Sequence, residues 1–361
     1  MIMPPRILLA GPEWVAGWTE STARALGQLG CTVEVFYYIR TGVTRQVQLG
    51  RKWLATLLGR EKKVTSPWIR KLYWRWTGVR AGSSLIVAAR EFSPDVVLVL
   101  KGEILKPRTL ALLRQGTGAS LAAWWVDDPF AMERQDGWRN AVTCLPLYDH
   151  VFVFDKQYFS PLKKRGVKRL TFLPCAADPE FYRPQDIADS ERGAYAATVS
   201  LVGMYYENRG RVVEQLLDEP GLRVWGTGWE WFFNNRLGKA GRTRVGGDVL
   251  RPDEVSKVYS SSVVNLNTHH PQSQNGGLNS RAFEIPAAGA FQLTDYVNGM
   301  EELLEPGREV AVYMTPQQVP ELVRRYINDP DSRNRTARAG YERVLAQHTY
   351  RHRMATILSS L

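Results

Sequence analysis

Arg281 and Glu284 are the two residues whose types and spacing point most directly to chemistry. They stand three apart in a segment, residues 279–288, whose polar start and apolar continuation predict a helix that breaks at Gly289. A helix start favours anions through its unpaired N–H groups and its dipole, and an arginine there suits a phosphate. The carboxylate one turn later is placed to accept hydrogen bonds from sugar hydroxyls. These residues predict a nucleotide-sugar pocket; the alternative is an amphipathic helix with a surface Arg–Glu pair.

Two further residues are candidates for binding the nucleotide sugar, which would be the sugar donor. They follow the first strand of the second half of the chain, predicted at residues 198–202. Open parallel sheets bind their ligands at the carboxyl ends of their strands. Gly203 lets the backbone approach a ligand there, and Arg209 opens the next predicted helix. Together with Arg281 this gives two cations for the two phosphates of a nucleoside diphosphate. The alternative for Arg209 is a surface position on its helix.

The next predicted strands of this half end in weaker signals. Trp225 and Gly226 belong to a Gly-x-Gly stretch with no dinucleotide fingerprint, so we expect the tryptophan either to stack on the nucleobase or to pack in the core. Asn267 ends a strand, and Asn279 precedes the donor helix. Both asparagines are expected to reach donor hydroxyls or, alternatively, to cap and turn the backbone.

Acidic residues follow three predicted strands of the first half. Asp127 and Asp128 end the stretch Trp-Trp-Val-Asp-Asp-Pro, where one of them is expected to act as catalytic base or to orient an acceptor hydroxyl. The alternative for Asp127 is an N-cap. Because strand alternation sends neighbouring side chains to opposite sides, we favour Asp127 for catalysis and Asp128 for capping the turn. Glu13 and Glu103 are the second-choice bases.

The histidines and the Asp-x-Asp triplet do not predict a metal site. His269 and His270 are adjacent and point different ways, and His348 and His352, which lie four apart on a predicted solvated helix, have no third ligand nearby. The triplet at residues 329–331 falls in a turn between helices. We therefore expect no metal and no cofactor other than the donor substrate itself.

The donor segment also resembles a family. Arg281-Ala-Phe-Glu-Ile-Pro-Ala-Ala-Gly289 resembles the donor-site helix of GT-B glycosyltransferases, and residues 299–310, 340–345 and 348–353 are similar to CgeB-like glycosyltransferases, which are named after a spore maturation protein. The resemblance is specific from about residue 199 to the end. It implies donor binding and metal-independent transfer. Many retaining GT-B enzymes carry another glutamate eight positions before Glu284, where this chain has Gly276, so neither inversion nor retention is predicted.

The order of predicted elements gives an α/β fold with two Rossmann-like domains. Apolar strands alternate with helices in both halves, which is typical of doubly wound parallel sheets. The proline-rich stretch 173–184 suits a linker. We expect an acceptor-binding domain at 1–177, a donor domain at 178–344 and a C-terminal helix at 345–361 that is available to cross back. In this GT-B architecture the two domains face each other across a cleft that holds the acceptor.

Composition agrees with a globular enzyme and sets one segment apart. The chain has 361 residues, is 44% hydrophobic and 23% charged, and carries three cysteines without a Cys-x-x-Cys, which favours a cytoplasmic location. Its formal charge of +11 is concentrated between Arg40 and Arg80, where eleven basic residues and one acidic residue mix with tryptophans. This insertion is expected to be a solvated basic helix or a peripheral contact with the membrane inner face or a lipid-linked acceptor; nucleic acid is least favoured.

The leading hypothesis is a hexosyltransferase-type enzyme. It moves a sugar from a nucleoside-diphosphate sugar to a protein, glycan or lipid-linked acceptor. One alternative keeps the fold and changes the reaction to nucleotide-sugar epimerisation or hydrolysis. Another is a basic membrane- or nucleic-acid-binding protein with a retired active site. Donor turnover separates the enzymes from the binding protein, and glycosyl transfer against free-sugar release separates transferase from hydrolase.

Overall fold

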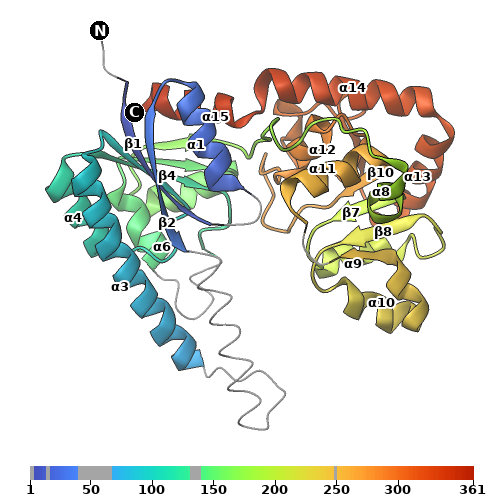
Figure 1. Ribbon diagram of the computed structural model, residues 1–361, viewed down its shortest axis with the longest axis horizontal. Coiled ribbons are helices and arrows are strands. Elements are labelled where there is room, and N and C mark those ends of the chain that lie inside the picture. Colours follow the sequence, from blue (N-terminus) through green and yellow to red (C-terminus); the bar gives the residue numbers. More distant parts are fainter. Residues whose placement is uncertain (1–3, 14–16, 40–66, 131–139, 248–249) are drawn as a thin grey trace. The chain divides into compact units, whose positions relative to one another are not determined.

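The computed structural model describes residues 4–13, 17–39, 67–130, 140–247 and 250–361, which form two α/β units (Figure 1). The first unit comprises Met1–Leu173 together with Met354–Leu361, and the second comprises Pro174–Arg353. Each unit contains one parallel sheet of six strands. The predicted α/β class with two parallel sheets is therefore confirmed.

The sheet of the first unit has the strand order β2-β1-β3-β4-β5-β6. Its central strand β3 consists of five apolar residues that are all buried, as expected for a strand covered on both faces. Helices α1, α3 and α4 contact strands of this sheet (Figure 1). The strands are β1 (Arg6–Pro12), β2 (Thr32–Ile39), β3 (Val96–Leu100), β4 (Ser120–Trp125), β5 (His150–Val153) and β6 (Leu170–Phe172). The α-helices are α1 (Trp18–Gln28), α3 (Pro67–Phe92), α4 (Pro107–Thr117), α6 (Asn140–Cys144) and α7 (Phe159–Lys164).

The sheet of the second unit has the order β12-β11-β10-β7-β8-β9, and its core is built on apolar residues of β7, β8, β10 and β11. The strands are β7 (Ala197–Val202), β8 (Leu222–Trp225), β9 (Val245–Gly247), β10 (Ser262–Asn267), β11 (Gln292–Asp295) and β12 (Ala311–Tyr313). The α-helices are α8 (Asp189–Tyr195), α9 (Glu207–Glu214), α10 (Trp229–Leu237), α11 (Pro252–Ser261), α12 (Arg281–Ala287), α13 (Val319–Asn328) and α14 (Pro330–Gln347). The last helix, α15 (Tyr350–Ser360), begins in the second unit and continues into the first.

All neighbouring strands in both sheets are parallel, so the carboxyl ends of the strands in each unit lie along one edge. The segments that follow β7, β10 and β11 in the second unit therefore lie near one another. The same holds for the segments that follow β1, β3 and β4 in the first unit. These two edges carry the candidate residues.

The last helix joins the two units along the chain. Arg353, in the first turns of α15, donates from Nε to the carbonyl oxygen of Pro174 at 2.9 Å and from Nη2 to that of Cys175 at 2.9 Å. At the other end of α15 the carbonyl oxygen of Ser360 accepts from His150 Nδ1 at 3.3 Å. Arg353 therefore holds the start of this helix to the segment where the chain first enters the second unit.

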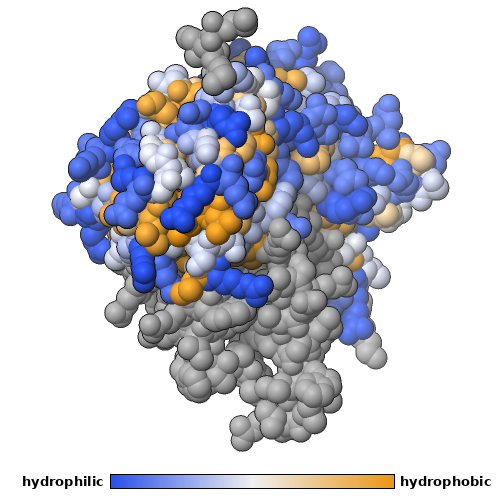
Figure 2. Space-filling model, turned by 60° about the vertical axis from the view of Figure 1, so that its left-hand side comes forward, coloured by the Kyte–Doolittle hydropathy of each residue, from blue (hydrophilic) through white to orange (hydrophobic). Residues whose placement is uncertain are grey.

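Part of the basic, tryptophan-rich insertion predicted at residues 40–80 lies outside the described residues, which resume at Pro67. From there α3 runs for 26 residues to Phe92, with Val79 and Val87 exposed on it. On the face of the first unit shown in Figure 2, hydrophilic and apolar residues are interleaved. Among the helices of the described ranges, none combines the length and hydropathy needed to cross a membrane.

Candidate functional site

Gly203, directly after β7, lies between two guanidinium groups. A Cβ atom built on Gly203 would stand 2.8 Å from Nη1 of Arg209 and 3.4 Å from Cζ of Arg281. Gly203 also has φ of 143°, a conformation that strongly favours glycine. Arg209 belongs to the first turns of α9, and Arg281 is the first residue of α12. Arg209 and Arg281, which are 72 positions apart in the sequence, are thus brought together, as expected for the predicted phosphate site.

Arg209 is buried, with 4% of its surface exposed. Its Nη1 donates to the carbonyl oxygen of Met204 at 2.7 Å, and its Cζ lies 4.9 Å from the ring centre of Tyr206. Burial, and then the neighbouring charge of Arg281, lower the pKa of Arg209 to about 9. The charge of Asp295 offsets the burial of Arg209 only in part, and a bound phosphate would offset it further.

Arg281 presents its charge differently. It is half-buried, and within the described ranges its guanidinium donates no hydrogen bond. Its electrostatic neighbours are Arg209, Glu284 and Tyr259. A planar guanidinium with unused donors, held beside a second one, matches the oxygens of a phosphate group.

Glu284 is on the same helix, one turn after Arg281, and is 9% exposed. Its carboxylate accepts hydrogen bonds from Ser280 and Tyr182. Burial raises the pKa of Glu284, and Arg281 with these two hydrogen bonds offsets the effect only in part. The hydroxyl of Tyr259, which is close enough to interact electrostatically with both Glu284 and Arg281, has no hydrogen-bond partner in the described part of the chain. The surface Arg–Glu pair weighed as the alternative does not describe this helix.

The two asparagines position α12. Asn267 Nδ2 donates to Asn279 Oδ1 at 3.1 Å, and Asn279 Nδ2 returns a bond to Asn267 Oδ1 at 2.9 Å. Asn279 Oδ1 also accepts from the backbone N–H of Ala282 at 3.2 Å. These amides are occupied with each other and with the start of the helix, which favours the capping role over contact with donor hydroxyls.

Trp225 and Gly226 shape the wall behind Gly203. Trp225 is 1% exposed, packs with Ala197 and Val258, and lies under the guanidinium of Arg223 at 4.9 Å, a position that favours core packing over base stacking. At Gly226 a Cβ would stand 2.4 Å from the carbonyl oxygen of Gly203. Only glycine allows this approach, so Gly226 supports the loop that carries Gly203.

A pair that the sequence reading missed stands at the same edge. His269, which follows β10, is 3% exposed, and its Nδ1 lies 2.8 Å from Oδ1 of Asp295, the last residue of β11. The backbone N–H of His269 also donates to that oxygen at 2.9 Å. Histidine and aspartate at the ends of two neighbouring parallel strands was the signal that could have revealed the pair. Considering His269 only with His270, as a metal motif, obscured it.

The acidic candidates of the first unit are divided by their surroundings. Asp127 Oδ2 lies 2.5 Å from Nζ of the buried Lys101, and 35% of the Asp127 side chain is exposed. Glu103 is 4% exposed and accepts from the hydroxyl of Tyr38 at 2.9 Å. Burial raises the pKa of Glu103, with Lys101 opposing. Asp127 is thus held in place by Lys101 and open to solvent. Glu103 is buried and interacts with the same lysine and with Tyr38.

The other two acidic candidates make backbone contacts. Asp128 Oδ1 accepts from the N–H of Phe130 at 2.8 Å, the contact that a turn-capping carboxylate makes. Glu13 is half-buried and donates its backbone N–H to the carbonyl oxygen of Ile39 at 2.9 Å. Both follow strands at the carboxyl edge of the first sheet, as predicted.

No group of three or more potential metal ligands of the His, Cys, Asp and Glu types occurs in the ranges that the structure describes. One detail of the histidine reading was wrong: His348 is not on a solvated helix. It is 4% exposed, ends α14, and lies with Nδ1 2.9 Å from Nη2 of Arg353. Burial and the charge of Arg353 lower the pKa of His348 to about 3, so its ring is a neutral core group.

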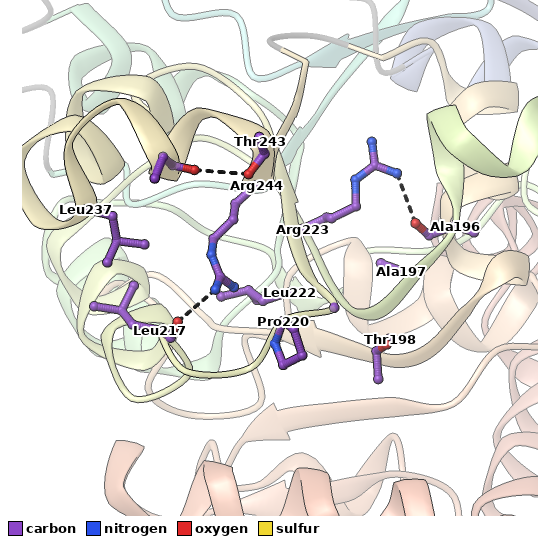
Figure 3. A pocket seen from close by; sticks show the side chains of 12 residues that line it. Ala196, Ala197, Thr198, Leu217, Pro220, Leu222, Arg223, Leu237, Thr243 and Arg244 are labelled. Carbon is purple, nitrogen blue, oxygen red and sulfur yellow. Dashed lines mark hydrogen bonds between the residues drawn. The ribbon is translucent and has the colours of Figure 1, made fainter.

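A hollow of about 820 Å³ lies at the opposite, amino-terminal edge of the second sheet (Figure 3). Its two arginines are committed to backbone carbonyls: Arg223 Nη1 donates to Ala196 at 2.9 Å, and Arg244 Nη2 donates to Leu217 at 2.8 Å. The residues that line it do not include Gly203, Arg209, Arg281 or Glu284. This hollow is therefore distinct from the candidate donor site.

Comparison with known proteins identifies similar sequences and folds. Residues 209–359 match the model of a glycosyl transferase-like family. Over 270 residues the chain is 22% identical to spore protein CgeB of Bacillus subtilis (strain 168). This alignment covers 72% of the chain and 80% of CgeB. The predicted CgeB-like resemblance is therefore confirmed.

Two solved structures show the fold over almost the whole chain. HepE of Anabaena in complex with UDP-glucose has a TM-score of 0.65 and 13% identity, and the match covers 99% of this chain and 100% of HepE. Sucrose-phosphate synthase of Thermosynechococcus elongatus has a TM-score of 0.66 and 14% identity, with 99% and 98% covered. The GT-B fold predicted from the sequence is confirmed.

Proposed function

We propose that this chain, which carries a glycosyl transferase-like segment at residues 209–359 on a GT-B fold, transfers a sugar from a nucleoside-diphosphate sugar to an acceptor. The observation that carries the proposal is the convergence of Arg209 and Arg281 on Gly203. Two like charges held together and partly desolvated are unfavourable unless an anion binds between them. A diphosphate is the anion that a glycosyl donor of this fold would bring.

In this proposal the two arginines compensate the charge that develops on the diphosphate when the sugar–oxygen bond breaks. Fixed donors aimed at a developing charge are among the largest contributions to catalysis. Arg209 and Arg281 would supply this charge compensation without a divalent ion. We therefore include metal independence in the proposal.

Glu284 is assigned to the hydroxyl groups of the donor. Its carboxylate retains acceptor capacity beyond the bonds from Ser280 and Tyr182. The HepE structure contains UDP-glucose, which makes this nucleotide sugar the first donor to test. The acceptor, a protein, a glycan or a lipid-linked molecule, is assigned to the first unit. There Asp127, held by Lys101, is the proposed base or orienting group.

Nucleotide binding tests the donor site directly. The purified protein is titrated with UDP, GDP and dTDP by calorimetry, alongside Arg209→Met and the matched control Arg211→Met. Arg211 is on the same helix, exposed and paired with Glu207 at 2.6 Å, so its replacement leaves the site intact. We expect at least one nucleoside diphosphate to bind, Arg209→Met to bind roughly tenfold or more weakly, and Arg211→Met to match wild type.

Product analysis then separates the reactions. Incubation with UDP-glucose and a candidate acceptor should give glycosylated acceptor, and the rate should persist in EDTA. Free sugar alone would indicate a hydrolase, and an altered nucleotide sugar would indicate an epimerase. A protein that binds no nucleoside diphosphate would be the retired binding protein. Loss of transfer in EDTA with recovery in magnesium or manganese would contradict metal independence.

A further inference from the structure

We propose that His269, held by Asp295, is a further donor-binding residue whose Nε2 donates a hydrogen bond to the diphosphate, an inference that rests on the proposed function. Nothing in the resemblance or in the arginine pair assigns a role to either residue. The argument comes from where the pair lies, how the ring is held, and what its second nitrogen lacks.

The pair lies beside the two arginines. In the register of β10 and β11, Asn267 stands opposite Thr294, so the residues just beyond both strands emerge together at the carboxyl edge. Arg209 reaches the same place: its Nε lies 3.4 Å from the carbonyl oxygen of Thr268, and the charge of Asp295 acts on its guanidinium. His269 is thus next to the group proposed to hold the diphosphate.

The ring is fixed from one side. Its Nδ1 donates to Asp295 Oδ1 at 2.8 Å, and the backbone N–H of His269 binds both carboxylate oxygens, at 2.9 and 3.2 Å. Burial alone would raise the pKa of Asp295, but the ring and backbone of His269 together hold it below its usual value. Asp295 is therefore an anion and accepts the Nδ1–H of the ring.

The other side of the ring has no partner. His269 Nε2 is buried and forms no hydrogen bond within the described ranges, and the same is true of the Tyr259 hydroxyl near Arg209 and Arg281. A role limited to tying β10 to β11 would need only the backbone N–H and Nδ1. A buried polar atom without a partner is costly, so a ligand that accepts from Nε2 explains why a histidine stands here.

The chemistry follows from this geometry. A ring that carries protons on both nitrogens donates through Nδ1 to Asp295 and through Nε2 to a phosphate oxygen. When the bond between the sugar and that phosphate breaks, negative charge grows on the departing oxygen and the hydrogen bond becomes stronger. The proposed step involves no proton transfer to or from the ring.

Two substitutions separate this role from a structural one. In His269→Asn the amide nitrogen takes the place of Nδ1, so the bond to Asp295 is kept and Nε2 is lost. In His269→Gln the amide nitrogen reaches the position of Nε2. We expect His269→Asn to weaken binding of the nucleoside diphosphate that wild type binds by roughly tenfold or more, and His269→Gln to weaken it less. His270→Asn, the exposed neighbour, is the matched control and should bind like wild type.

The decisive measurement is affinity by calorimetry, with the melting temperature of each ligand-free variant as the test of folding. Wild-type affinity in a folded His269→Asn would overturn the proposal, as would a loss seen with the nucleotide sugar but not with the nucleoside diphosphate. If His269→Asn does not fold, Asp295→Asn provides the test, because it removes the anion that accepts the Nδ1–H: unchanged affinity there would also overturn the proposal. Failure of the wild type to bind any nucleoside diphosphate would instead contradict the proposed function.

Discussion

Replacing Glu284 by glutamine should weaken donor binding and, at neutral pH, stabilise the folded protein. The substitution keeps the shape of the side chain and removes its charge. A hydrogen bond to a charged group contributes roughly 1.5–3 kcal/mol, and about 1.4 kcal/mol corresponds to a tenfold change in affinity. Loss of one hydroxyl contact to the carboxylate should therefore raise the dissociation constant of the nucleoside diphosphate about tenfold to a hundredfold.

The stability change has the opposite sign. Because burial raises the pKa of Glu284, the folded state binds this proton more tightly than the unfolded state does. The free energy of unfolding then falls as pH rises from the unfolded pKa, near 4.5, through the folded value. Glutamine resembles the protonated form and escapes this loss. The melting temperature of Glu284→Gln should exceed that of wild type at pH 7 to 8, and the difference should shrink as pH falls toward about 4.

Calorimetry at pH 7.5 gives the affinity, and melting curves across this pH range give the stability. Glu342→Gln is the matched control, since Glu342 is exposed in the same unit and pairs with Arg338 at 2.9 Å. An unchanged dissociation constant would remove Glu284 from the site. The gain in melting temperature of Glu284→Gln over wild type should be larger at pH 7.5 than at pH 5. A smaller gain at pH 7.5 would refute the reasoning from burial.

Two further predictions concern turnover and stability. Asp127→Asn should reduce turnover by at least about two decades at unchanged nucleotide affinity. Asp128→Ala loses the acceptor of a turn hydrogen bond and should chiefly lower the melting temperature. Equal initial rates for Asp127→Asn and wild type would remove Asp127 as the base. Arg353→Met should lower the free energy of unfolding by about 3 kcal/mol, because one buried and two part-buried hydrogen bonds to backbone carbonyls are lost. Denaturation curves that coincide with those of the exposed-site control Arg351→Met would contradict this.

The central part of each sheet could be predicted because burial on both faces leaves a clear mark on the sequence. β7 (Ala197–Val202) begins within one residue of the predicted strand at 198–202, and α12 ends before Gly289 as expected. The strands that were missed, β6, β9 and β12, are three residues long and each forms an edge of its sheet. A strand that short has no periodicity to detect, and only its neighbour in the folded sheet makes it a strand.

The site was predictable where chemistry depends on position along the chain and less so where it depends on burial. The sequence places Arg281 and Glu284 one turn apart, and the strand-end rule brings Arg209 to them. It does not reveal that Trp225 lies in the core or that His348 is buried against Arg353, because both facts depend on segments distant in sequence. The pairing of His269 with Asp295 needed the strand order of the folded sheet.

The described part of the second unit combines features that are unfavourable one by one. Two guanidinium groups face each other, a glutamate is buried beside a tyrosine hydroxyl without a partner, and a histidine nitrogen lacks an acceptor. An apolar residue at each of these positions would destabilise the folded state less, and a protein selected for stability alone would lose the polar groups. We propose that one ligand with phosphate oxygens and hydroxyl groups would satisfy all of them together. These unfavourable contacts are the reason to expect that ligand binding stabilises the second unit, so the melting temperature should rise with the concentration of nucleoside diphosphate.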